Sequence, residues 1–260
     1  MLNKAKNIYI SQILQNTQIA KNIYDMWLLC PEVAKNAVCG QFCTVYLQES
    51  STLLPRPLSI CEIDTKKGAV RIVYRVQGKG TSYLSTLYSQ VKILAPLGNG
   101  FDLDFDNKNF TIVGGGIGVP PLLELSKFIR HSISDSKVDV YLGFRDADDI
   151  ILKDDFGKYA DNIFITTDNG TFGHKGIATD LLQNLKTDII YSCGPTPMLK
   201  SLYSIAKKQN IPLIISLEER MACCLGVCFA CVIRTKNNNF KKLCSQGPVI
   251  NANELIWEEV

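Results

Sequence analysis

The 260-residue sequence predicts a β plus α/β protein with three parts: an antiparallel β-barrel, a doubly wound parallel-sheet domain and a small C-terminal unit. In the first part, short segments of alternating apolar and polar residues follow one another with turns between them, which is typical of an antiparallel barrel. From Asn109 onward, apolar segments alternate with helical patterns, as in a doubly wound sheet. The third part carries a run of closely spaced cysteines.

The barrel domain is expected to span residues 1–105. Its strands are predicted near 7–15, 23–30, 41–48, 58–64, 69–76 and 90–98, with a helix near 81–88. The segment Pro96-Leu97-Gly98-Asn99-Gly100 is dense in residues that interrupt regular structure, so it marks the end of this domain.

The parallel-sheet domain is expected to span residues 106–216, and the cysteine-rich unit residues 217–260. Strands are predicted near 109–113, 137–144, 162–167, 187–193 and 211–217, and helices near 119–131, 147–159, 176–185 and 196–208. In a sheet of this kind, ligands bind at the carboxyl ends of the strands.

Composition limits the classes of function. A net charge of +3 gives no electrostatic argument for binding nucleic acid or a membrane surface. No apolar segment approaches the roughly 18 residues of a membrane-spanning helix, and the N-terminus does not read as a signal peptide. Ten cysteines without an export signal indicate metal or redox use in the cytoplasm. Those outside the C-terminal motif are expected to be buried small hydrophobes, with Cys193 as the one exception that is also a functional candidate: Cys30, Cys39, Cys43, Cys61, Cys193 and Cys224.

The C-terminal motif contains Cys223, Cys228, Cys231 and Cys244, spaced Cys-x4-Cys-x2-Cys-x12-Cys. This is the spacing of plant-type 2Fe–2S ferredoxins, in which a tight loop supplies three thiolates and the fourth comes from further along the chain. Gly226 allows the sharp turn that such a loop needs. The alternatives are a structural zinc site, which more naturally contains two separated Cys-x2-Cys pairs, and unrelated buried cysteines.

A glycine-rich segment follows the first predicted parallel strand and opens a helix. Gly114, Gly115, Gly116 and Gly118 allow the backbone to turn tightly and approach a pyrophosphate, whose charge then faces unpaired amides. A plain strand-to-helix turn is the alternative. After the next strand, Asp146 is placed to accept a hydrogen bond from a ribose hydroxyl, which favours NAD over NADP. Arg145 favours NADP instead, because a guanidinium can bind a 2′-phosphate.

The barrel contains the residue types that a flavin requires. Its pyrophosphate needs an arginine and backbone amides, and its reactive nitrogen needs a nearby hydroxyl such as that of Ser59. These types occur in order in three segments: Arg56-Pro57-Leu58-Ser59, Val73-Tyr74-Arg75 and Gly80-Thr81. Cys193 ends a parallel strand at the edge where a nicotinamide would meet the flavin, so Ser59 and Cys193 are the candidate catalytic residues. An incidental arginine and serine, and a buried thiol, are the alternatives.

These motifs, together with Pro96–Phe101 and Cys193-Gly194-Pro195, resemble the ferredoxin–NADP reductase superfamily. Within it, Glu218–Cys223, the cysteine run and Cys244–Val249 resemble the electron-transfer subunits of class B dihydroorotate dehydrogenases. Two departures from that pattern concern the cysteine segment. Cys224 replaces the usual glycine, and Ser245-Gln246 replaces the usual Lys-Asp.

The resemblance implies an FAD-binding barrel, an NAD domain and a 2Fe–2S domain with the four motif cysteines as ligands. It also implies a partner, an FMN-containing catalytic subunit that oxidises dihydroorotate to orotate in pyrimidine biosynthesis, in a heterotetramer with two copies of each subunit. Trp257 and Phe229 are candidate apolar contacts for that partner. A position in the core is the alternative for Trp257 and, because it lies between two ligands, the expectation for Phe229. The competing hypotheses are a reductase that stands alone or serves another partner, with ferredoxin-, sulfide- or glutamate-linked chemistry, and a non-catalytic redox sensor.

Overall fold

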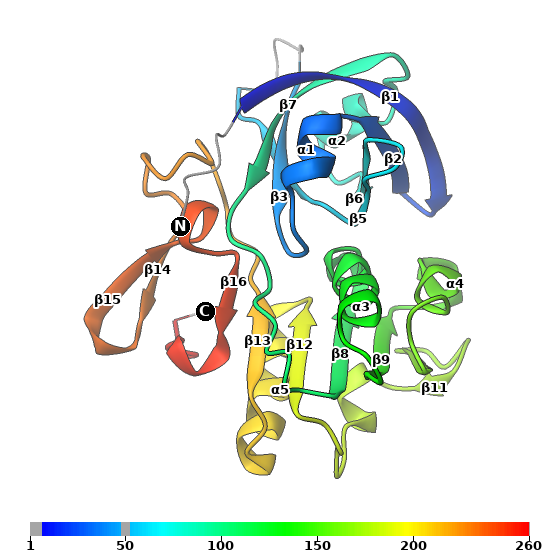
Figure 1. Cartoon of the computed structure of the whole chain (residues 1–260), viewed down its shortest axis with the longest axis vertical. Coiled ribbons are helices and arrows are strands. Elements are labelled where there is room, and N and C mark those ends of the chain that lie inside the picture. The colour runs from blue at the N-terminus through cyan, green and yellow to red at the C-terminus, as the bar shows by residue number, and fades with distance from the viewer. Residues whose placement is uncertain (1–6, 48–52, 260) are drawn as a thin grey trace.

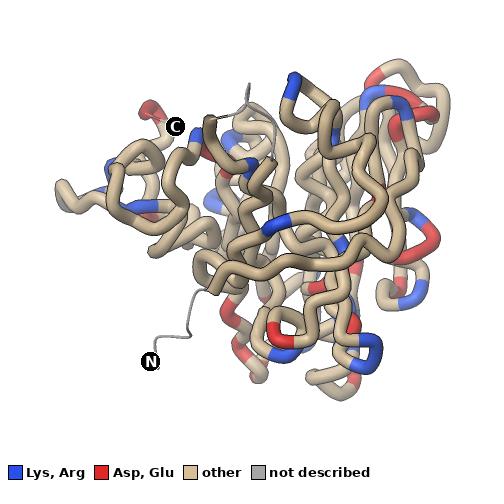
Figure 2. The backbone as a smooth tube through the Cα atoms, turned by 90° about the horizontal axis from the view of Figure 1, so that it is seen from above, with Lys and Arg blue, Asp and Glu red and all other residues tan. Residues whose placement is uncertain are grey.

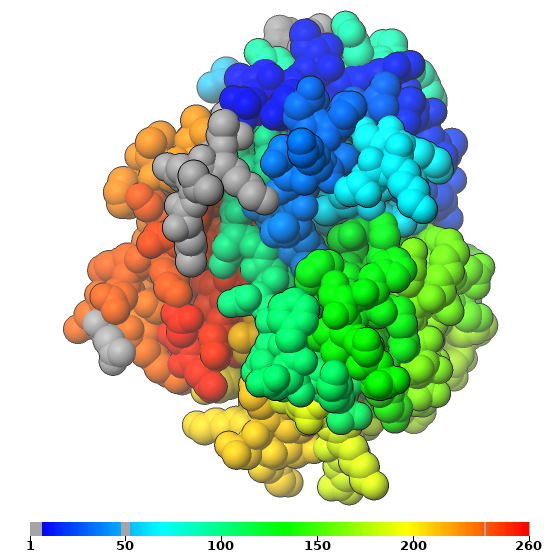
Figure 3. Space-filling model, viewed as in Figure 1, coloured from blue at the N-terminus to red at the C-terminus, as the bar shows by residue number. Residues whose placement is uncertain are grey.

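The computed structural model describes residues 7–47 and 53–259, apart from the side chain of Asn237. Figure 1 shows a curled antiparallel sheet above a parallel sheet with helices, and a small C-terminal unit beside both. In the space-filling view, the orange and red C-terminal unit packs along the side of the molecule (Figure 3). This arrangement confirms the predicted fold class.

The first sheet has seven strands in the order β4-β3-β7-β1-β2-β6-β5, and all of its pairs are antiparallel. It curls into a barrel around a core that includes Met26, Leu28, Ile72 and Ile93. The strands are β1 (Asn7–Ala20), β2 (Ile23–Leu29), β3 (Phe42–Tyr46), β4 (Arg56–Ser59), β5 (Glu62–Asp64), β6 (Ala69–Arg75) and β7 (Gln90–Leu97). Two short helices complete it, α1 (Pro31–Asn36) and α2 (Lys79–Leu84).

The barrel differs from the sequence prediction in two places. The single strand expected at 58–64 is divided into β4 and β5, because Ile60 and Cys61 bond to two different neighbours: the Ile60 amide to the Gln41 carbonyl, and the Cys61 amide to the Arg71 carbonyl. The helix expected at 81–88 begins earlier and ends at Leu84, after which single turns continue.

The second sheet has seven strands in the order β11-β10-β9-β8-β12-β13-β16. All neighbours are parallel except β16, which runs antiparallel to β13. Its strands are β8 (Asn109–Gly115), β9 (Lys137–Phe144), β10 (Asn162–Thr167), β11 (His174–Lys175), β12 (Ile189–Cys193), β13 (Leu213–Ser216) and β16 (Val249–Asn251). Helix α3 (Pro121–Ser132) packs with Ile112 and helix α5 (Thr196–Gln209) with Val113, so the two helices cover opposite faces.

Two predicted helices of this part are wrong. Residues 147–159 form only a 3₁₀ turn, Ala147–Asp149, and the short α4 (Lys153–Phe156). Leu152 between them has a φ of +59°, a left-handed conformation that a right-handed helix cannot include. Residues 176–185 form only the 3₁₀ turn Ala178–Leu181, since Gly176 and Asn184 also have positive φ values.

The C-terminal unit holds the cysteine loop and the hairpin β14 (Val232–Thr235) and β15 (Asn239–Lys242), followed by α6 (Leu243–Gln246). Its last strand, β16, extends the parallel sheet. Trp257 is buried and stacks on Tyr203 of α5 at 4.9 Å, so it is a core residue and not a surface contact. The expectation that Phe229 is a core residue is also wrong, because its side chain is 64% exposed.

Acidic and basic residues are interspersed along the backbone, in keeping with the small net charge (Figure 2). Among the described residues, no helix combines the length and the apolar character needed to cross a membrane.

Candidate functional site

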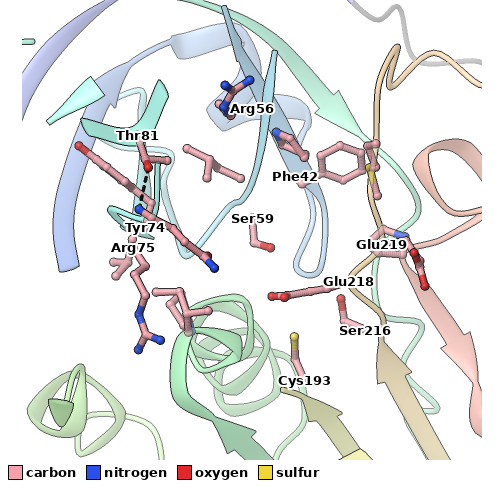
Figure 4. Close-up of a pocket in the computed structure, with 18 of the residues that line it drawn as sticks. Phe42, Arg56, Ser59, Tyr74, Arg75, Thr81, Cys193, Ser216, Glu218 and Glu219 are labelled. Carbon is pink, nitrogen blue, oxygen red and sulfur yellow. Dashed lines mark hydrogen bonds between the residues drawn. The ribbon is translucent and has the colours of Figure 1, made fainter. Parts of the chain in front are cut away.

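A cavity of about 490 Å³ lies between the barrel and the carboxyl edge of the parallel sheet (Figure 4). Its walls come from β4, β6, the start of α2, the end of β12 and the segment after β13. We call it the barrel pocket. All the residues that the sequence assigned to a flavin line it: Arg56, Pro57, Leu58, Ser59, Val73, Tyr74, Arg75, Gly80 and Thr81. Segments distant in the sequence therefore converge on one cavity.

Arg56 and Gly80 fit closely together at one end of the barrel pocket. A Cβ atom at residue 80 would lie 2.5 Å from Nε of Arg56, so a side chain there would displace the guanidinium from its present position. The Thr81 hydroxyl accepts hydrogen bonds from the amides of Gln77 and Gly78 and so shapes the turn that leads into α2. A fixed guanidinium beside a closely folded backbone suits a pyrophosphate, so the residues present fit FAD.

Tyr74 supports the barrel pocket from within the barrel core. Its hydroxyl donates a hydrogen bond to Oδ1 of Asn16 at 3.0 Å, and the Asn16 amide donates to the carbonyls of Leu84 and Leu87. Burial raises the pKa of Tyr74, so the phenol stays protonated. Tyr74 therefore connects the pocket wall to the end of α2.

Four polar side chains meet at the inner end of the barrel pocket: Ser59, Cys193, Ser216 and Glu218. Figure 4 shows the Glu218 carboxylate pointing toward Ser59, with Ser216 and Cys193 close by. Burial is the main cause of the raised pKa of the Cys193 thiol. The charge of Glu218 raises this pKa further, and a hydrogen bond with Ser216 lowers it in part. Cys193 is therefore a neutral thiol in the wall of the cavity.

Sequence reasoning assigned no function to two residues of this group, Ser216 and the acidic residue Glu218. The side chain of Glu218 is open to the cavity but surrounded by protein. The resulting desolvation raises the pKa of its carboxyl group, and the positive charge of Arg75 lowers that pKa in part. Glu218 and Ser59 line the same cavity, so a carboxyl group with a raised pKa and a hydroxyl are both available to a ligand there. The available signal for Glu218 was its position just after a parallel strand, at the edge where ligands bind.

A second cavity, also about 490 Å³, adjoins the first and lies over the glycine-rich loop. We call it the sheet pocket. Gly115, Gly116 and Gly118 line it, whereas Gly114 packs against Val119 and Leu122 and does not. Gly116 has a φ of +52° and faces open space, so its backbone is accessible to a ligand. This loop is a suitable cradle for the pyrophosphate of NAD.

The two pockets share three lining residues, Arg75, Ile117 and Glu218. A Cβ atom at Gly118 would lie 2.6 Å from the Cys193 carbonyl oxygen, so the glycine loop packs directly on the end of β12. Ligands in the two pockets would therefore meet next to Glu218 and Cys193. This is the arrangement that transfer of a hydride between two cofactors requires.

The acidic residue predicted to bind the ribose, Asp146, is placed differently from the expectation. Its carboxylate accepts hydrogen bonds from the amides of Asp148 and Asp149 at 3.0 and 3.2 Å, and it does not line the sheet pocket. Asp149 and Asp168 line the pocket instead, together with Arg145. The sequence predicted acidic character at this pocket, and in the structure Asp149 and Asp168 supply it in place of Asp146.

The four cysteines of the C-terminal motif approach one another in two pairs. The side chains of Cys223 and Cys228 form one hydrogen-bonded pair and those of Cys231 and Cys244 the other. Burial opposes ionisation of Cys223, but hydrogen bonds from the amides of Leu225 and other loop residues and from Cys228 together outweigh it and lower its pKa to about 6. In the described part of the chain, no three His, Cys, Asp or Glu side chains converge on a point suited to a single ion. Four thiols in two pairs suit a two-iron cluster.

Cys224 differs from its neighbours in the loop. It has a φ of +55°, which explains why glycine suits this position, and its side chain is buried against the core. Burial raises its pKa to about 12, so it remains a thiol. Gly226 has a φ of +81°, and a Cβ atom there would lie 3.0 Å from the Ser245 hydroxyl. Ser245 therefore packs against the turn of the loop.

The cysteine loop presents an apolar surface. Leu225, Val227 and Phe229 lie between the cysteines and are 46%, 70% and 64% exposed. The Lys242 ammonium lies over the Phe229 ring at 4.9 Å. Clusters of exposed apolar residues mark interaction sites on proteins. We call these three residues the loop patch.

Comparison with known proteins agrees with this geometry. Residues 218–256 match the iron–sulfur cluster binding domain of dihydroorotate dehydrogenase B. The chain is 37% identical over 253 residues to the electron transfer subunit of dihydroorotate dehydrogenase B (NAD(+)) from Clostridium perfringens, covering 96% of this chain and 99% of that one. The corresponding subunit from Bacillus pumilus is 40% identical over 259 residues, with 96% and 98% covered.

Solved structures support the fold. A chain of the NADH-dependent reduced ferredoxin–NADP oxidoreductase, studied for flavin-based electron bifurcation, superposes with a TM-score of 0.87 at 30% identity and covers all of this chain and 92% of its own length. The ferredoxin reductase of carbazole 1,9a-dioxygenase superposes with a TM-score of 0.69 at 16% identity, covering 82% and 68%. The chain belongs to the family of electron transfer subunits of NAD(+)-dependent dihydroorotate dehydrogenase B.

Proposed function

We propose that the chain carries electrons from a catalytic partner through a 2Fe–2S cluster and FAD to NAD, while the partner oxidises dihydroorotate to orotate. The observation that carries this proposal is the pair of adjoining pockets that share Arg75, Ile117 and Glu218, in the same chain as the paired cysteines. FAD exchanges electrons singly with a cluster and in pairs with a nicotinamide, so this set of cofactors joins the two kinds of chemistry.

The residues of the chain bind and orient these groups. Arg56 and the backbone at Gly80 hold the FAD pyrophosphate, and the glycine loop at Gly116 holds that of NAD. Cys223, Cys228, Cys231 and Cys244 ligate the cluster. Ser59 and Glu218 line the inner end of the barrel pocket, where they would donate or accept a proton beside the reactive rings of bound FAD and NAD. Cys193 forms the wall behind them and excludes water from this point.

The partner is an FMN-containing subunit, and we place its docking site at the loop patch. An electron from the partner must reach the cluster through a short path, and the exposed Cys228 is flanked in the loop by the exposed apolar residues Leu225, Val227 and Phe229. An interface with an apolar centre would shield this region from water. A heterotetramer with two copies of each subunit and a cytoplasmic location complete the proposal.

Reconstitution tests this function. The isolated chain is expected to reduce artificial acceptors with NADH but to show no dihydroorotate-dependent formation of NADH. Adding the FMN-containing partner should establish that activity, and a Val227→Asp variant should lose it while retaining reduction of artificial acceptors. A Cys228→Ser variant in the complex should also lose it. Rapid oxidation of dihydroorotate by the isolated chain would overturn the proposal.

A second candidate function is that of a subunit serving a ferredoxin- or NADP-linked partner. The likeness to the NADH-dependent reduced ferredoxin–NADP oxidoreductase chain over the whole length favours it. Co-purification from the native host distinguishes the two, because the bound subunit either contains FMN and oxidises dihydroorotate or does not.

Selectivity for NADH is expected to depend on Asp168 and not on Asp146. Asp168 lines the sheet pocket, where its negative charge repels a 2′-phosphate, whereas Asp146 is engaged with the amides of its own turn. The Asp168→Asn variant should raise the NADPH to NADH ratio of kcat/KM by about tenfold, which corresponds to about 1.4 kcal/mol. Asp146→Asn, which preserves the cap, is the matched control. The assignment is wrong if Asp146→Asn produces the larger change in diaphorase assays.

A further inference from the structure

A network of buried ion pairs joins the barrel to the helices of the parallel sheet. At its centre, Arg71 of β6 donates from Nε and Nη2 to both carboxylate oxygens of Asp25 in β2, each at 2.9 Å. The remaining nitrogen, Nη1, donates to Asp155 of α4 at 2.9 Å and to Glu62 of β5 at 3.3 Å. One guanidinium therefore binds two barrel strands and a helix of the other sheet.

A second group of contacts continues from Glu62 to helix α3. Lys127 lies 3.4 Å from Glu62 and 3.3 Å from Glu124, and it donates to the carbonyl of Ile63 at 2.6 Å. The Glu124 carboxylate accepts a hydrogen bond from the Ile63 amide at 2.8 Å, and the Glu124 amide donates to the Cys61 carbonyl at 3.1 Å. The Cys61–Ile63 segment of the barrel is thus held by α3 through both main-chain and side-chain bonds.

These groups are sheltered from solvent. The side chains of Arg71, Asp25, Glu62 and Lys127 are exposed by 11%, 6%, 17% and 18%. Burial alone would lower the pKa of Arg71, but its bonds to carboxylates raise it, so the guanidinium remains charged. Paired charges with little access to water are held in one geometry more strictly than exposed pairs.

The position of α3 determines how the two pockets meet. The helix begins at Pro121, directly after the glycine loop, and Ile117 and Pro120 of this connection line the barrel pocket. The same loop forms the sheet pocket through Gly116 and Gly118. Because Glu124 and Lys127 lie in the first two turns of α3, the network sets where the glycine loop stands relative to the barrel.

We infer that this network, Arg71–Asp25–Glu62–Asp155–Lys127–Glu124, is a clamp that sets the distance between flavin and nicotinamide. The inference rests on the proposed function, because it concerns hydride transfer between FAD and NAD, which is followed here in the reverse direction, as the step in which NADH reduces FAD. In that step the C4–H bond of the nicotinamide breaks, and the hydride passes with both electrons to N5 of the flavin. NADH is oxidised to NAD⁺, and the flavin is reduced. Arg71, Asp155 and Lys127 are positioning residues, because they act through α3 and α4.

The test uses the full chain loaded with FAD and cluster, and variants that change one contact across the interface. Asp155→Asn removes the charge that meets Arg71, and Lys127→Met removes the cation between Glu62 and Glu124. Lys158→Met is the matched control: Lys158 binds the other oxygen of Asp155 at 2.6 Å but is exposed and lies on the same side of the interface. Lys127→Arg is the conservative variant.

Anaerobic stopped-flow bleaching of the flavin by NADH gives the limiting rate and the apparent dissociation constant separately. We expect Asp155→Asn and Lys127→Met to lower the limiting rate by about tenfold to a hundredfold, as small misplacements of reacting groups do. FAD and cluster spectra should be unchanged, and Lys158→Met and Lys127→Arg should react like wild type.

Limiting rates within twofold of wild type for both Asp155→Asn and Lys127→Met would overturn the clamp. Loss of FAD or cluster from these variants would also overturn it, because the network would then maintain the cofactor sites themselves and not their spacing. The proposed function fails in a different way, namely if NADH does not reduce the flavin of the wild-type chain.

Discussion

Replacing Cys223, Cys228, Cys231 or Cys244 singly with serine is expected to abolish the visible absorption of the 2Fe–2S cluster. The physical reason is the pairing of the four thiols, since each iron of the cluster requires two of them. Iron and sulfide content, together with the electron paramagnetic resonance signal after reduction, measure the outcome. FAD should remain bound, because the barrel pocket contains none of these cysteines.

Cys224→Ala is the matched control for the ligand variants. The Cys224 side chain is buried in the core and its pKa is raised to about 12, so it does not supply a thiolate near neutral pH. The variant should keep a full complement of iron. Loss of the cluster in Cys224→Ala, with retention in Cys223→Ser, would show that the ligand assignment is incorrect.

Replacing Arg56 with alanine is expected to weaken FAD binding by about tenfold to a hundredfold. A hydrogen bond to a charged group contributes about 1.5–3 kcal/mol, and each 1.4 kcal/mol corresponds to a factor of ten. Gly80→Ala should act in the same direction, because the added Cβ would lie 2.5 Å from Nε of Arg56 and displace the guanidinium. Equilibrium dialysis and flavin fluorescence after gel filtration measure the change.

Arg234→Ala is the control for the loss of an arginine. Arg234 is exposed on the C-terminal unit, where it pairs with Glu259 at 3.1 Å and Asn238. It should retain FAD like wild type. If Arg56→Ala and Gly80→Ala both retained FAD at wild-type affinity, Arg56 would not be the residue that holds the pyrophosphate.

Much of the fold could be predicted from the sequence, because its strongest signals are local. Strands β8, β9, β10, β12 and β13 and helices α3 and α5 follow from apolar periodicity, and the glycine loop follows from its residue types. The weakest predictions were the helices at 147–159 and 176–185, where Leu152 and Asn184 adopt left-handed conformations that periodicity does not report. Burial of the cysteines outside the motif was confirmed for all of them.

The candidate site likewise has features that the sequence predicts and features that depend on tertiary packing. The order and spacing of Arg56–Ser59, Gly80-Thr81 and the four motif cysteines are properties of the sequence, since each motif needs only neighbouring residues to be recognised. The placement of Glu218 in the same cavity as Ser59, and of Asp168 in place of Asp146 at the sheet pocket, depends on how distant segments pack. The burial of Trp257, for which the sequence left surface and core open, and the exposure of Phe229, which was expected in the core, have the same origin, because burial depends on what covers a side chain.

The clamp is the clearest example of a feature that depends on tertiary structure. Arg71 and Asp155 are 84 positions apart in the chain, and each by itself is an ordinary charged residue in a strand or a short helix. Local sequence determines that β6 and α4 form, but an ion pair depends on the distance between two atoms of different elements. That distance is set by the packing of the barrel against the parallel sheet, and it therefore exists only in the folded protein.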